Sequence, residues 1–259
     1  MNGDILKVIK IGGNVVDSRE GLADFLRDYA AIPGPKVLVH GGGKIATRTA
    51  AELGVETCMI NGRRVTSPAM LDVAVMVYAG LVNKRIVAQL QSLGVNAIGL
   101  CGADAGCITS VRRPAVPVDY GEVGDVTAVN AGALMSLITA GMTPVICAIT
   151  ADTAGNLLNT NADTVATETA KALSALAPVE LIFCFEKNGV LADVDDPDSV
   201  IGKITAADAD TLIGNGIIRG GMLPKVENAL RALNESAIQS VVIKSSRHLG
   251  NYTGTRVTK

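Results

Sequence analysis

The chain has 259 residues and a formal net charge of −2, and its composition is 48% hydrophobic and 19% charged. Such a composition is typical of a globular protein with a sizeable core, which excludes a disordered chain and disfavours a nucleic-acid partner. Four Tyr, three Phe and no Trp are too few aromatic residues for a base-stacking surface. The length fits one large α/β domain or two closely packed lobes.

Short runs rich in Val and Ile alternate along the chain with longer segments of helical periodicity. We expect strands at residues 5–11, 36–39, 56–60, 95–100, 145–149, 179–184 and 240–244. We expect helices at residues 19–31, 44–53, 68–93, 130–140, 162–176, 206–214 and 222–234. This alternation predicts a parallel or mostly parallel sheet that carries helices on its faces.

Residues 126–151 contain no charged side chain and are long enough for a membrane span. Gly141-Met142-Thr143-Pro144 divides this stretch, so we expect a buried helix and a central strand, with no membrane partner. At the N-terminus, Lys7 and Lys10 interrupt the apolar run, which is not the pattern of a signal peptide. The five cysteines are spread out and lack a Cys-x-x-Cys pair, as expected for reduced thiols rather than a zinc site. We therefore expect a cytoplasmic protein.

Glycine clusters lie beside two lysines that are far apart in the chain. The segments are Lys10-Ile11-Gly12-Gly13 and Gly220-Gly221-Met222-Leu223-Pro224-Lys225, and a third cluster, Gly41-Gly42-Gly43, follows His40. Glycine lets backbone NH groups approach an anion closely, and a lysine adds a compact positive charge. Since ligands gather beyond the carboxyl ends of parallel strands, the strand ends at Lys10, His40 and Ile149 could converge. The pattern favours a phosphoryl group held from two sides.

Simpler interpretations of these segments remain open. Lys10 could be an exposed lysine at the end of a strand, and the glycine triplet could be a structural turn. Residues 41–46 also match the Gly-x-Gly-x-x-Ala dinucleotide fingerprint, but the next strand ends at Asn61 rather than at an acid. A Walker A pattern is absent from the sequence as well. The acidic stretch at residues 193–198 lacks the spacing of a calcium loop.

Asp163 and Arg64 have two interpretations each. Asp163 could accept charge-assisted hydrogen bonds from two lysine ammonium groups, or it could cap the helix that begins beside it. Arg64 offers a planar fork that suits a substrate carboxylate, or it could simply lie on the surface of a hairpin; of the pair, Arg63 is favoured as the surface residue. Sequence alternation alone does not choose between them.

Taken together, these motifs resemble the amino acid kinase family over nearly the whole chain. The Arg-Val-Thr and Asn-x-Asn-Ala-Asp blocks favour its acetylglutamate branch over the carbamate, uridylate and aspartate kinases. The matching segments, in family order, are Lys10-Ile11-Gly12-Gly13, Val39-His40-Gly41-Gly42-Gly43, Asn61-Gly62-Arg63-Arg64-Val65-Thr66, Asn83-Lys84, Asn159-Thr160-Asn161-Ala162-Asp163, Asn188-Gly189-Val190-Leu191 and Gly221-Met222-Leu223-Pro224-Lys225-Val226.

The resemblance implies a three-layer αβα sandwich around a mostly parallel sheet, the carbamate kinase-like fold. An N-terminal lobe, residues 1–173, would bind the N-acyl-glutamate and carry the interface of a homodimer, and a C-terminal lobe, residues 174–259, would bind ATP. The implied reaction moves the γ-phosphoryl group of ATP to the side-chain carboxylate of N-acetyl-L-glutamate, an acyl phosphate step of arginine biosynthesis. Mg²⁺ would be carried by ATP rather than by protein ligands.

The resemblance also implies roles for individual residues. Lys10 and Lys225 would stabilise the transferring phosphoryl group, and Asp163 would organise both lysines. Backbone NH groups would come from Gly12 and Gly13 on the phosphate side and from Gly42 and Gly43 on the substrate side, while Arg64 and Asn159 would hold the α-carboxylate of the substrate. The implied nucleotide-binding residues are Glu186, Lys187, Asn188, Gly189, Val190, Leu191, Ile217, Ile218, Arg219, Gly221 and Met222.

This chain departs from the family pattern in two places. Phe185-Glu186-Lys187-Asn188 stands where the family usually has an Asp-Val pair, which leaves the adenine and ribose contacts open. The sequence also begins almost directly at its first expected strand, without the extra helix of arginine-inhibited hexameric relatives, so we expect a dimer insensitive to arginine. Two alternative functions are the same reaction on N-succinyl-L-glutamate and a non-catalytic, ligand-binding regulator on the kinase fold.

Overall fold

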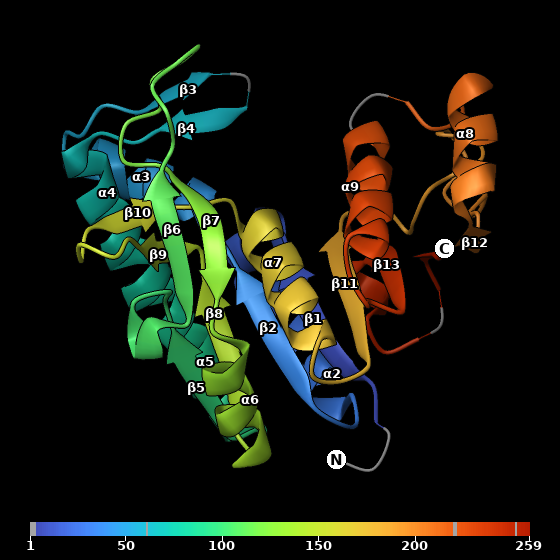
Figure 1. The fold of residues 1–259 in the computed structure, drawn as a ribbon, viewed down its shortest axis with the longest axis horizontal. Helices are drawn as coiled ribbons and strands as arrows, with labels where there is room; N and C mark the ends of the chain where they lie inside the picture. Colours follow the sequence, from blue (N-terminus) through green and yellow to red (C-terminus); the bar gives the residue numbers. More distant parts are fainter. Residues whose placement is uncertain (1–3, 61, 220–221, 252) are drawn as a thin grey trace.

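The computed structural model describes residues 4–60, 62–219, 222–251 and 253–259. Its centre is an eight-stranded sheet in which six neighbouring strands are parallel and β14 runs antiparallel to β13 (Figure 1). The mostly parallel sheet predicted from the sequence is therefore confirmed. In spatial order the strands are β12 (Lys203–Ile204), β14 (Thr255–Val257), β13 (Ser240–Ser245), β11 (Val179–Phe185), β1 (Leu6–Ile11), β2 (Lys36–His40), β8 (Thr143–Cys147) and β5 (Ala97–Leu100).

Helices cover both faces of this sheet and make it the middle layer of an αβα sandwich (Figure 1). One face packs against α1 (Gly13–Asp17), α2 (Arg19–Ala31), α3 (Gly43–Glu52), α4 (Pro68–Val75), the π-helical segment η1 (Met76–Val82) and α5 (Asn83–Ser92). The other face packs against α6 (Ala131–Thr139), α7 (Ala162–Ser174), α8 (Ala206–Gly214) and α9 (Leu223–Asn234). Each face has its own hydrophobic core.

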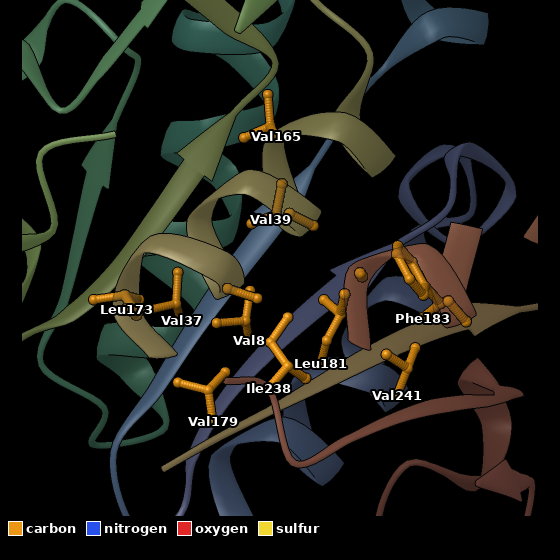
Figure 2. Packing of buried hydrophobic residues seen from close by; sticks show 14 of the residues in the cluster. Val8, Val37, Val39, Val165, Leu173, Val179, Leu181, Phe183, Ile238 and Val241 are labelled. Atoms are coloured by element: carbon orange, nitrogen blue, oxygen red, sulfur yellow. The ribbon is translucent and has the colours of Figure 1, made fainter. Parts of the chain in front are cut away.

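Side-chain alternation along the strands divides the apolar residues between these two cores. On β1, Leu6 and Val8 belong to the core under α7 and α9, whereas Ile9 and Ile11 belong to the core under α2 to α5. The first of these cores is drawn in Figure 2, where Val8 lies among residues of β2, β11, β13 and α7. Lys10 follows Leu6 and Val8 on the same face, so the strand directs its side chain towards α7 and α9.

Smaller sheets flank the centre. A four-stranded sheet in the order β10 (Leu157–Asn159), β9 (Ile149–Ala151), β6 (Ile108–Arg112) and β7 (Gly124–Val129) lies beside α4, and the hairpin of β3 (Cys58–Ile60) and β4 (Arg63–Val65) stands apart. Two 3₁₀ turns, η2 (Asp104–Gly106) and η4 (Ser246–His248), complete the described elements. Residues 126–151 contain the expected inner strand, β8, and a helix, α6, but the helix is only half buried, with Leu134 and Ile138 as its buried residues. None of the described helices is both long enough and apolar enough to cross a membrane.

Candidate active site

Lys10 forms an ion pair between the central sheet and α7. It is the fifth residue of β1, its exposed fraction is 8%, and its Nζ lies 2.7 Å from Oδ1 of Asp163. Asp163 belongs to the first turn of α7, which packs across β1 and β11. The interpretation of Lys10 as an exposed strand-end lysine is therefore wrong, because the side chain is buried and paired with the predicted carboxylate.

Asn161, rather than Asp163, caps α7. The Asn161 side chain accepts hydrogen bonds from the backbone NH groups of Asp163, at 2.8 Å, and of Thr164, at 3.2 Å. The capping interpretation that was open for Asp163 is therefore wrong. Because a neighbour satisfies the helix terminus, the carboxylate of Asp163 is free to face Lys10.

Lys225 approaches the same place from the opposite side, on the first turn of α9. Its Nζ lies 3.6 Å from the centre of the Phe185 ring, and Nζ of Lys10 lies 5.5 Å from the same centre. Burial lowers the pKa of Lys225, and the negative charge of Asp163 partly opposes that shift. The Nζ atoms of the two lysines predicted to act together therefore both lie over the ring of Phe185.

The glycine triplet opens α3 next to these lysines. Gly42 is the N-cap residue of α3, and helix starts present backbone NH groups that no intrahelical partner satisfies. A Cβ atom on Gly42 would lie 2.9 Å from Cδ1 of Tyr78, which leaves no room for a side chain. Nη2 of Arg64 donates hydrogen bonds to the carbonyl of Gly43, at 3.0 Å, and to Oγ1 of Thr47, at 2.7 Å. Arg64 of the hairpin is thus the inward-facing member of the arginine pair.

His40 forms a hydrogen bond with the first glycine of the triplet. The imidazole is fully buried, with Nδ1 at 2.8 Å from the carbonyl of Gly41 and Nε2 at 3.1 Å from Nδ2 of Asn83. Since the Asn83 amide nitrogen can only donate, Nε2 accepts, and Nδ1 donates its proton to Gly41. Burial lowers the pKa of His40 to about 4, so the ring is neutral and holds the Gly41 peptide in place.

The buried His40 predicts that the protein loses stability in mild acid. Its pKa is about 4 when folded and 6.5 as a reference, so the unfolded chain binds more protons in this window and stability rises with pH. We expect the free energy of unfolding to fall by about 2 kcal/mol between pH 7 and pH 5 on account of this group. Urea unfolding at each pH measures it. His40→Asn should flatten the slope, and an unchanged slope would contradict the assignment.

Two adjoining cavities meet at the triplet. The larger, of about 1010 Å³, is lined by Lys10, Gly12 and Gly13 and by most of the predicted nucleotide residues, namely Glu186, Lys187, Gly189, Val190, Leu191, Ile217, Arg219 and Met222. The smaller, of about 630 Å³, is lined by Asn159 and Asp163. Residues 41–43, Arg64, Phe185 and Lys225 line both cavities. Lys225 therefore lies where the two spaces join, and the ion pair of Lys10 with Asp163 has one member in each cavity.

Among the described residues, two predicted nucleotide residues are not part of this lining. Nδ2 of Asn188 donates to the carbonyl of Pro197, at 3.1 Å, and Ile218 has an exposed fraction of 2% within the core under α7 to α9. Gly221 lies outside the described residues. Asn188 and Ile218 thus belong to segments that line the larger cavity without lining it themselves.

Sequence reasoning did not single out Phe185, Tyr78 or Lys44. Phe185 ends β11 one residue beyond the predicted strand, Tyr78 packs against Gly42, and Lys44 lines the larger cavity and contacts Oδ1 of Asn14. The position of Phe185 at the carboxyl end of a central parallel strand was a usable signal. Among the described residues, no three His, Cys, Asp or Glu side chains are grouped as they would be to hold a metal ion.

Comparison with known proteins places this arrangement in a family. The chain matches the model of the amino acid kinase family over residues 6–244. The acetylglutamate kinase of Bacteroides thetaiotaomicron is 54% identical over 254 residues, which cover 98% of each chain.

Solved structures agree with the sequence match. The protein smu.665 of Streptococcus mutans UA159 has a TM-score of 0.76 at 30% identity over 98% of each chain. The carbamate kinase of Giardia lamblia, solved with bound AMP-PNP, has a TM-score of 0.70 at 17% identity over 100% of each chain, which confirms the predicted carbamate kinase-like fold. By sequence and by architecture, the chain belongs to the amino acid kinase family.

Proposed function

We propose that the chain is an ATP-dependent kinase that transfers the γ-phosphoryl group to the side-chain carboxylate of N-acetyl-L-glutamate, forming an acyl phosphate in arginine biosynthesis. A relative that is 54% identical is an acetylglutamate kinase, which supports this substrate. The observation that carries the proposal is the position of Lys10, Asp163 and Lys225 around the junction of the two cavities.

The chemistry of this acceptor suits a site without a general base. A glutamate side chain has a reference pKa of about 4.3, so it is already an ionised nucleophile at neutral pH. His40 is buried, neutral and engaged at both ring nitrogens, and it has no proton-transfer role in this reaction. The barrier lies in bringing an anionic carboxylate to an anionic phosphate chain. Lysine ammonium groups and backbone NH groups lower it by stabilising the transferring group.

We assign ATP to the larger cavity and the acyl-glutamate to the smaller one. This division follows the proposed lobes, residues 1–173 and 174–259. In the smaller cavity, Arg64 contacts the neutral groups of Gly43 and Thr47, so its charge is available to a substrate carboxylate. Nδ2 of Asn159 donates to Oγ1 of Thr66, which fixes the orientation of its amide in the cavity that Arg64 also lines. Mg²⁺ enters on the phosphates of ATP, where it neutralises charge during the transfer.

The experiment that tests this function traps the acyl phosphate. The protein is incubated with MgATP, hydroxylamine and either N-acetyl-L-glutamate or N-succinyl-L-glutamate, and hydroxamate is measured. Faster hydroxamate formation from the acetyl compound is the expected result. A preference for the succinyl compound would replace the proposed substrate. No hydroxamate from either, together with calorimetric binding of an acyl-glutamate, would make the chain a regulator on the kinase fold.

We also propose a homodimer that forms through the middle of the 68–92 helix. This helix is uncharged from residue 73 to residue 83, and it exposes Met76, by 53%, and Leu81, by 39%. Exposed apolar side chains on one helix are typical of a surface that a partner covers.

We propose that this protein is cytoplasmic. Its cysteines are free and three of them are buried, which suits a reducing compartment.

A charge placed on this helix tests the dimer. We expect the double variant Met76→Glu/Leu81→Glu to be monomeric by light scattering where the parent chain is dimeric, because two charges would be buried without partners. Leu176→Glu is the matched control, since Leu176 is 55% exposed but lies beyond α7. A parent chain that is already monomeric, or a variant that stays dimeric, would contradict the proposed interface.

A further inference from the structure

Phe185 occupies the place where the elements carrying the two lysines come together. It is the last residue of β11, and side-chain alternation puts it on the same face as Leu181 and Phe183, under α7 and α9. In the parallel pairing of β1 with β11, Lys10 lies opposite Phe183. The Phe185 ring is stacked on Phe183, with centroids 6.0 Å apart and planes inclined by 19°. Phe183 belongs to the core drawn in Figure 2, so the ring rests on a packed base.

The lysines differ in how the structure holds them. Lys10 has an ion pair with Asp163 at 2.7 Å. Among the described residues, Lys225 forms no ion pair. Its Nζ instead lies 3.6 Å from the centre of the Phe185 ring. Both ammonium groups lie within the roughly 6 Å over which an aromatic face attracts a cation.

We propose that Phe185 is a positioning residue, whose ring holds Lys225, and more weakly Lys10, in place for phosphoryl transfer. This inference rests on the proposed kinase function. An aromatic face orients a cation through its quadrupole and carries no net charge. A carboxylate in the same place would neutralise the lysine and repel an anionic nucleotide, whereas the ring leaves the full positive charge of Lys225 available to the phosphoryl oxygens.

The geometry allows the ring and the phosphate to be bound together. An ammonium group has three N–H donors, and the ring contacts it from one side. Phe185 and Lys225 both line the two cavities, so the remaining side of the ammonium group faces the space that we assign to the reacting groups.

A fluorinated series at position 185 separates this role from simple packing. Phenylalanine analogues with one, two and three ring fluorines keep the shape of the side chain and progressively weaken the negative face. We expect kcat for hydroxamate formation to fall at each step, and Phe185→Leu to lower it by about 3- to 30-fold. The same series at Phe25, a core residue stacked on Tyr29, is the matched control and should leave kcat unchanged.

A second measurement does not depend on turnover. Because Nζ of Lys225 lies over the ring, its ε-methylene protons should show an upfield ring-current shift that Phe185→Leu removes. If the parent enzyme is active but kcat does not change across the fluorinated series at position 185, or the upfield shift of Lys225 is absent, the role of Phe185 alone is overturned. An inactive parent enzyme would instead overturn the proposed function, so the two failures are distinguishable.

Discussion

Lys10→Met will slow phosphoryl transfer by at least about 100-fold, the usual cost of removing one donor that stabilises a developing charge. Two effects combine in this variant. The phosphoryl group loses a positive partner, and Asp163, now unpaired, places a negative charge beside an anionic nucleotide. The measurement is kcat for hydroxamate formation at saturating MgATP. Lys7→Met is the matched control on the same strand, because Nζ of Lys7 reaches the carbonyl of Pro33 away from both cavities.

The double variant Lys10→Met/Asp163→Asn tests whether the pair acts as a unit. If Asp163 serves to hold Lys10, removing its charge costs nothing more once the lysine is gone. We therefore expect the double variant to be no slower than Lys10→Met, and faster if the unpaired carboxylate repels ATP. If the rate loss of the double variant instead equalled the product of the losses of the two single variants, Asp163 would have a separate role.

Gly42→Ala will lower kcat/KM by about 100-fold, because misplacing a catalytic group by about 1 Å has that scale of effect. The added Cβ would lie 2.9 Å from Cδ1 of Tyr78, and that ring is buried and cannot swing away. The triplet must therefore shift, and its NH groups shift with it. We also expect a loss of about 1–3 kcal/mol in the free energy of unfolding, which is typical of overpacking.

The neighbouring glycine provides the control for this prediction. A Cβ atom on Gly43 would lie 3.9 Å from Nη2 of Arg64 and 3.9 Å from Oη of Tyr78, which are ordinary contacts. Gly43→Ala should therefore cost less in the free energy of unfolding than Gly42→Ala, because its Cβ overpacks no neighbour. If both substitutions had the same effect, crowding against Tyr78 would not be the cause.

The parallel core of the fold could be predicted because its strands are buried on both faces. The sequence placed a strand at residues 5–11, which differs from β1 by one residue at its start, and its helices at 19–31 and 206–214 coincide with α2 and α8. No strand of the four-stranded sheet was predicted as such: β9 and β10 have three residues, too few for a measurable periodicity, and the longer β6 and β7 were missed as well. Residues 76–82 were expected to be α-helical, and their π-helical winding has no signal in the sequence.

The candidate site was predicted as a set of residues, and its geometry was not. Motifs named Lys10, Asp163 and Lys225, but only the packing of α7 shows that Asn161 takes the capping role and leaves Asp163 to the lysine. The position of Phe185 at the end of a strand was a signal for the site, but the role of the ring could not be assigned from its own segment. Its neighbours there belong to the strand, whereas the two cations it contacts come from residues far away in the chain.

The pairing of β1 with β11 joins the two proposed lobes. All six residues from Leu6 to Ile11 have partners in the run from Val179 to Cys184, so the boundary between the lobes coincides with one of the most fully paired places in the sheet. A fragment of residues 174–259 would expose the free edge of β11, a row of unsatisfied backbone groups that invites aggregation. The halves are therefore not separable building blocks. Chemical denaturation of the whole chain should proceed as one cooperative transition, with both nucleotide and substrate sites lost together.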